Sequence, residues 1–253
     1  MTLLMAELNE MGALNFICLG IFLSCWIGYA RFAHFMAKRT ASLSSVLHVH
    51  RINWMRRMLQ REVRVGDAAL IANIERNVNF FASSCVLIIA GLLTAITATE
   101  KIKDMLGTVS FTAGDTLPQL ELKLMVLLGI FIYSYFTFTW SMRQFGFASV
   151  LIGAAPSPDD TTVTANDRRS MAIYSAKVID QASRSYNNGL RAFYFSMAVL
   201  SWFIGPYVFI GASLLVTTVL YQREFLSSSL KALKQAENVG EKVFTDDKEL
   251  YRR

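Results

Sequence analysis

Four long stretches of the chain contain no charged residue. They have 20, 23, 19 and 31 residues and lie at 11–30, 77–99, 124–142 and 192–222. A helix needs about 20 mostly apolar residues to cross the hydrocarbon core of a bilayer. The period-2 alternation of a membrane β-barrel is missing from these runs. The pattern therefore predicts an all-α protein, a multi-pass transmembrane helix bundle that forms a single integral membrane domain over residues 1–253.

We expect four spans at about 12–30, 78–98, 124–142 and 192–221. The fourth run poses a problem, because as one helix it would be about 46 Å long against a core of ~30 Å. Gly205-Pro206 lies in its middle. The run is either one long, kinked helix or a tight hairpin whose arms of about 14 residues are short for a crossing. We favour the kinked helix.

Basic residues predict the side of each loop, because Lys and Arg accumulate in cytoplasmic loops. Nine lie from Arg31 to Arg76 and six from Arg143 to Arg191, whereas the loop at 99–123 has three beside four acids. We therefore expect loops 31–77 and 143–190 in the cytoplasm, loop 99–123 outside, and the N-terminus outside. The first span lacks a preceding basic region, so we expect it to be retained rather than cleaved. A kinked fourth helix places the helical stalk and tail at 222–253 outside, against the seven basic residues there.

The first cytoplasmic loop contains a segment with an amphipathic helical pattern. Plotted on a helix, residues 51–65 place Trp54 and most apolar residues on one half and most arginines on the other. A basic helix of this kind suits the surface of an anionic membrane. The alternative is a helix packed on the protein's own cytoplasmic face. The candidate membrane-surface residues are Trp54, Arg56, Arg57, Arg61 and Arg64. A second helical pattern follows in the other loop, at about 167–186.

Each predicted span has an arginine at its cytoplasmic end, and amide side chains accompany some of them. If the spans form a bundle, the guanidinium groups share one level and could bind a phosphate such as a lipid head group. The alternative, which we favour, is that they only set the topology. The candidate lipid- or anion-binding residues are Arg31, Arg76, Arg143, Gln144, Asn188 and Arg191.

The first span also carries small residues at every fourth position: Gly20, Ser24 and Gly28. Such a stripe permits close helix contact. Packing within the monomer is the default expectation, and self-association or a partner subunit are the alternatives.

The sequence offers little for catalysis or cofactor binding. No acidic, basic or histidine side chain lies within the four uncharged runs, which argues against a proton-coupled transporter. His34, His48 and His50 lack neighbouring ligands, so we expect no metal, no haem and no other cofactor. The three cysteines lie inside spans and are expected to be buried thiols. We expect no catalytic residue.

Several motifs together resemble one known family. They are RINW at 51–54, Arg76-Asn77 followed by FAS at 81–83, WSMRQ at 140–144, LIGAAP at 151–156 and NGLRAFYF at 188–195. The chain is similar to the membrane proteins called Domain of Unknown Function 599, from about 16 to 221. The resemblance implies a helical membrane protein of bacterial type, with few spans and without an assigned activity. We therefore expect it in the bacterial cytoplasmic (inner) membrane.

The function that we expect is that of a non-enzymatic scaffold or accessory subunit. It would bind anionic lipid or membrane-protein partners, or form a homo-oligomer, and would not bind nucleic acid. One alternative is an oligomeric transporter or channel, lined by Ser134, Thr137, Thr139 and Ser201. A second is a lipid-modifying enzyme, for which Asp67 and Glu75 are the nearest acids.

Overall fold

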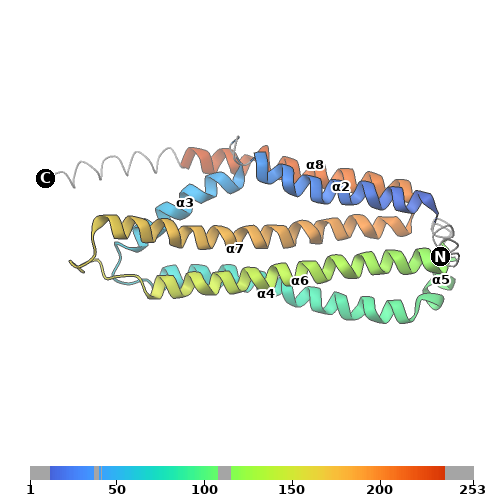
Figure 1. Cartoon of the computed structure of the whole chain (residues 1–253), viewed down its shortest axis with the longest axis horizontal. Helices are drawn as coiled ribbons and strands as arrows, with labels where there is room; N and C mark the ends of the chain where they lie inside the picture. Colours follow the sequence, from blue (N-terminus) through green and yellow to red (C-terminus); the bar gives the residue numbers. More distant parts are fainter. Residues whose placement is uncertain (1–11, 37–39, 41, 108–114, 237–253) are drawn as a thin grey trace, which may run out of the picture. The chain divides into compact units, whose positions relative to one another are not determined.

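The computed structural model describes residues 12–36, 40, 42–107 and 115–236, and this part of the chain is helical without a strand. The expected all-α class is confirmed. The helices are α2 (Ala13–Met36), α3 (Leu43–Met58), α4 (Val65–Thr97), α5 (Thr99–Gly107), α6 (Leu117–Gly153), α7 (Ala165–Leu200), a short 3-10 turn η1 (Ser201–Phe203) and α8 (Pro206–Phe225) (Figure 1).

The chain forms two compact units, each built from three separate segments. Unit 1 comprises Met1–Phe32, Asn79–Thr139 and Tyr186–Leu220, and unit 2 comprises Ala33–Val78, Trp140–Ser185 and Tyr221–Arg253. Helices α4, α6 and α7 each contribute one part to unit 1 and another to unit 2.

Within the residues that the structure describes, three helices are long and apolar enough to cross a membrane. The qualifying segments are Leu14–Ala33 in α2, Val65–Thr97, which is α4, and Leu117–Gly153, which is α6. The last two have 33 and 37 residues, so they exceed the roughly 20 residues that a crossing needs. The first three expected spans coincide with parts of these helices and extend at most two residues beyond their ends, and the fourth run gives no single helix of this kind.

The prediction of one kinked helix at 192–221 is wrong. Helix α7 ends at Leu200, and α8 begins at Pro206 after η1. Within unit 1 the Phe22 ring lies 5.7 Å from the Phe195 ring and 5.2 Å from the Phe209 ring. A continuous helix would separate residues 195 and 209 by about 21 Å. The two arms therefore form the hairpin alternative, and Figure 1 shows them running in opposite directions.

Local sequence explains the break. Pro206 has no N–H to donate to the preceding turn, so it interrupts a helix but is well suited to begin one. The N–H groups of Ile204 and Gly205 both donate to the Ser201 carbonyl, which closes α7 in a tight turn. The buried Trp202 ring then stacks on Phe209 at 4.6 Å and fixes the start of α8.

The core of unit 1 is aromatic and includes one buried cation. One aromatic group surrounds Phe22, and a second consists of Phe81, Phe138 and Phe193. Lys123 is 1% exposed, and its Nζ donates to Asp115 Oδ2 at 2.6 Å and to the Trp202 carbonyl at 2.9 Å. The hydrogen bond to the Trp202 carbonyl ties the start of α6 to the α7–α8 turn.

Unit 2 is a small helical assembly with a core of its own. Met55 and Met58 of α3, Ile71 of α4 and Phe145 of α6 are fully buried, as is Ala176 of α7. The tail after Tyr221 belongs to the same unit. Glu224 accepts hydrogen bonds from the Ser44 hydroxyl and backbone N–H at the start of α3, at 2.9 and 3.3 Å. The end of α8 therefore lies against the first cytoplasmic loop of the sequence prediction.

Candidate functional site

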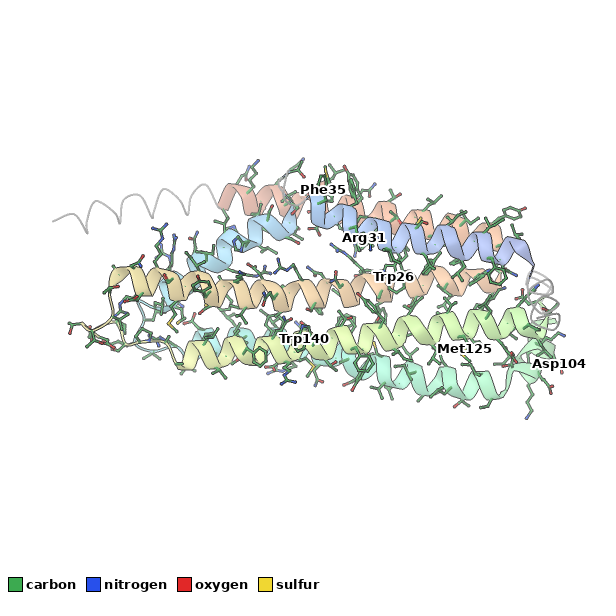
Figure 2. The ribbon with its side chains drawn as sticks, viewed as in Figure 1. Trp26, Arg31, Phe35, Asp104, Met125 and Trp140 are labelled. Carbon is green, nitrogen blue, oxygen red and sulfur yellow. The ribbon has the colours of Figure 1, made fainter. Side chains whose placement is uncertain are left out.

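The candidate lipid-binding residues are divided between the two units. Arg31, Asn188 and Arg191 belong to unit 1, and Arg76, Arg143 and Gln144 belong to unit 2. Arg31, Arg76 and Arg143 lie within about one helical turn of the point in the sequence where their helix passes from one unit to the other, and Arg191 lies further along α7. Arg31, labelled on α2 in Figure 2, is exposed, as are Arg76 and Arg143.

Aromatic rings orient two of these arginines. The Arg191 guanidinium on α7 lies 5.4 Å from the centre of the Tyr29 ring on α2, and the Arg143 guanidinium lies 5.9 Å from the Phe147 ring. The ring quadrupole attracts a cation placed over its face, so these contacts orient the two guanidinium groups. The Gln144 amide is different, because it is buried and its Oε1 accepts from the Ser185 hydroxyl at 2.9 Å. Gln144 therefore packs α6 against α7.

The predicted surface helix at 51–65 ends early. Helix α3 stops at Met58, and Arg61 and Arg64 lie in the segment before α4. The reason is a set of tertiary bonds. The buried Asp67 carboxylate accepts from Trp54 Nε1 at 2.7 Å and from Arg61 Nη1 at 2.6 Å. Arg64 donates to the carbonyls of Ala155, at 2.5 Å, and Pro156.

The apolar side of α3 is covered by protein rather than left for a membrane. Met55, Met58 and the following Leu59 are at most 3% exposed. This supports the alternative interpretation, a helix packed on the protein's own face. Of the five candidate surface residues only Trp54, Arg56 and Arg57 lie on the helix. Lipid binding by these residues stays a prediction.

Two histidines tie α3 to other parts of unit 2. His48 Nδ1 pairs with Asp180 Oδ2, and Arg51 Nη1 donates to Asp180 Oδ1 at 2.6 Å. His50 Nε2 lies 3.0 Å from the Leu233 carbonyl. The sequence analysis missed Asp180, although an acid directly after Val178-Ile179 in an apolar helical pattern signals a buried partner. The described residues contain no group of three or more potential metal ligands, and the side chain of His34 lies outside them.

The small-residue stripe of α2 faces outward. Gly20, Ser24 and Gly28 are all exposed, and a Cβ placed on either glycine would meet nothing within 4 Å. The stripe therefore makes no close helix contact within unit 1, contrary to the default expectation. Contact with a partner or second copy through this stripe stays a prediction.

The residues of the two alternative functions are mostly engaged within the fold. The Thr137 and Thr139 hydroxyls donate to backbone carbonyls one turn earlier in α6. The Ser201 hydroxyl donates to the Ala198 carbonyl at the end of α7. Ser134 is buried and its hydroxyl has no partner among the described residues. Asp67 is only 1% exposed and already accepts two hydrogen bonds, whereas Glu75 is partly exposed.

Comparison with known proteins identifies the family. A family model described as "Protein of unknown function, DUF599" matches residues 17–229, which is most of the chain. The protein belongs to this family. The expectation from the sequence motifs is thereby confirmed. No curated protein matches the chain. No solved structure matches it either.

Proposed function

We propose that this protein is a non-enzymatic scaffold or accessory subunit of a bacterial cytoplasmic membrane, where it binds anionic lipid head groups. One observation supports the lipid part above all. Arg31, Arg76 and Arg143 are exposed, and within the described part of the chain none of them pairs with an acid. An exposed guanidinium can donate two parallel hydrogen bonds to a phosphate.

The distribution of charge supports an orientation in the membrane. Among the described residues, the Lys and Arg of unit 1 are Arg31, Lys101, Lys103, Lys123 and Arg191, and those of unit 2 are Arg51, Arg56, Arg57, Arg61, Arg64, Arg76, Arg143, Arg168, Arg169, Lys177, Arg184, Arg223, Lys231 and Lys234. Basic segments remain in the cytoplasm. In our proposal unit 2 is therefore cytoplasmic and unit 1 lies in the bilayer.

This orientation implies five crossings rather than four. The chain passes through unit 1 in α2, α4, α6, the second half of α7, and α8. Helix α8 has 20 residues, about 30 Å, and the 15 of them that belong to unit 1, 206–220, span about 22 Å of a hydrocarbon core of ~30 Å. The N-terminus would lie outside and the C-terminus in the cytoplasm, so that the seven basic residues of the tail also follow the positive-inside rule.

Native mass spectrometry after gentle extraction tests the lipid-binding proposal. The wild type should retain phosphatidylglycerol at a fixed stoichiometry. The double variant Arg31→Gln/Arg76→Gln should lose most of it, because each basic group near an anionic surface contributes about 1 kcal/mol of attraction.

A matched control removes the same charge elsewhere. Lys101 and Lys103 are exposed on α5, which follows the C-terminal end of α4. Arg76 lies in the N-terminal half of α4. Lys101→Gln/Lys103→Gln should retain the lipid. Equal retention in both double variants would contradict the proposed lipid site.

A further inference from the structure

Helices α6 and α7 pack side by side within unit 2 and leave one flank of the pair uncovered. Ser141 donates to the Ala182 carbonyl at 2.7 Å, and Ser185 donates to Gln144 at 2.9 Å. These residues define the sides on which the two helices face each other. The helices run in opposite directions, as Figure 1 shows.

The exposed positions of the two helices lie on the same flank. On α6, positions 143, 147 and 150 are rotated by about 90–150° from the α6–α7 contact, at 100° per residue. On α7, positions 174, 177 and 184 are rotated by about 50–130° in the same sense. Rotation in the same sense in an antiparallel pair leads to the same side of the pair, so the six positions form one surface.

This surface is apolar and basic. Phe147, Val150 and Tyr174 are 45%, 68% and 65% exposed, respectively. Arg143, Lys177 and Arg184 are exposed around them. Among residues 140–150 and 174–184 the one acid is Asp180, which is buried and paired with His48 and Arg51. We name these six residues the α6–α7 face.

We infer that the α6–α7 face binds an acidic amphipathic helix of a partner protein. The inference rests on the proposed function, since it takes unit 2 to be cytoplasmic. Apolar residues of such a helix would cover Phe147, Val150 and Tyr174, and its carboxylates would pair with the three cations. A large exposed apolar patch with polar surroundings is typical of a protein interaction site.

Two other occupants fit the face less well. Helix α6 has 37 residues, about 55 Å, and the face runs along its part beyond unit 1. The bilayer that α6 crosses lies across this helix, so it cannot cover a surface that runs parallel to the helix axis. A second copy of the chain would bring three cations against three cations across a two-fold axis, which costs Coulomb energy.

A peptide-binding assay tests the inference with the full-length protein in phosphatidylcholine nanodiscs, whose lipid has no net charge. The probes are two 18-residue amphipathic helices with the same leucine face, one with glutamates and one with lysines on the other face. The glutamate peptide should bind, and Lys177→Glu/Arg184→Glu should weaken it by about tenfold or more. Phe147→Ser/Tyr174→Ser should weaken it as well.

The matched control reverses two exposed cations elsewhere in unit 2. Lys231→Glu/Lys234→Glu makes the same charge change on the segment after α8 and should alter the affinity by no more than about twofold. Equal weakening in both charge variants, or equal binding of the two peptides to the wild type, would overturn the inference. Thermal melts of every variant separate lost binding from lost folding.

Photo-crosslinking in cells identifies the natural occupant. A benzoylphenylalanine at position 174 should crosslink to a protein segment that mass spectrometry shows to be acidic and amphipathic. Crosslinks to a second copy of this chain, or to lipid alone, would overturn the inference. The lipid-binding proposal is judged separately, because its test changes Arg31 and Arg76, which do not belong to the α6–α7 face, and the peptide test leaves both unchanged.

Discussion

A single glycine sets how closely α7 approaches α6 in unit 1. A Cβ on Gly189 would lie 2.6 Å from Phe138 Cε1, well inside van der Waals contact. Phe138 is fully buried and stacks on Phe81 with 5.6 Å between ring centres, so it has little room to move. We expect Gly189→Ala to lower the free energy of unfolding by about 1–3 kcal/mol, as overpacking does. Thermal unfolding in detergent measures the change.

Gly129 provides the control at the same scale. It lies in the interior of α6, and a Cβ there would meet nothing within 4 Å. Gly129→Ala should be neutral or stabilising by up to about 1 kcal/mol, because alanine has the higher helix propensity. Phe138→Leu should partly rescue Gly189→Ala if the clash is the cause. A Gly189→Ala protein as stable as the wild type would show that α6 and α7 can separate at no cost.

The start of α7 is fixed by a local motif at the scale of one element. The Thr164 backbone N–H and hydroxyl donate to Asp167 Oδ2 at 3.1 and 2.6 Å, and the Asp167 N–H donates to the Thr164 hydroxyl at 3.2 Å. This reciprocal pairing is a capping box, which satisfies free N–H groups at a helix start. The hydrogen bond from the Thr164 hydroxyl, followed by the weaker effect of the bond from the Thr164 backbone N–H, lowers the pKa of Asp167 below its ordinary value of 3.8.

The lowered pKa of Asp167 gives the pH dependence a definite sign. The carboxylate stabilises the cap above its ordinary pKa, and this contribution is lost as the pH falls through the lowered value. Hydrogen exchange at residues 165–168 should therefore be protected at pH 7 and lose protection in Asp167→Asn. Asp159→Asn, an exposed aspartate in the preceding loop, should leave the protection unchanged. Equal protection in both variants would show that the capping box does not hold the first turn.

At the scale of the whole molecule, the chain returns to unit 2 after α8 and reaches the first loop. Besides the Glu224–Ser44 contact, Leu230 is buried and the Leu233 carbonyl lies against His50. In the proposed orientation, with unit 2 in the cytoplasm, we expect the C-terminus to be cytoplasmic. A fluorescent protein fused to the C-terminus should fluoresce in cells, and alkaline phosphatase fused there should be inactive.

An insertion on the other side completes the topology test. Alkaline phosphatase inserted before Thr116, in the segment between α5 and α6, should be active because that loop lies outside in the five-crossing arrangement. An active C-terminal phosphatase would instead support an even number of crossings. It would contradict the proposed orientation of unit 2.

The sequence determined the class of the protein, the family, and where its first three apolar helices lie. These features depend on composition along the chain, since long uncharged runs favour helices in a bilayer whatever their neighbours are. The charge pattern also showed that an arginine borders each uncharged run. The local motif at Gly205-Pro206 permitted both a kink and a turn, because either one accommodates the missing N–H of proline.

The tertiary structure decided the rest. The Phe22 ring between Phe195 and Phe209 selects the hairpin, and Asp67 draws Arg61 and Trp54 together and thereby ends the predicted surface helix at Met58. Small residues permit close packing without saying against what, so only the fold showed that the stripe at Gly20 and Gly28 is open. Such outcomes depend on contacts between residues far apart in the chain, which a local pattern does not encode.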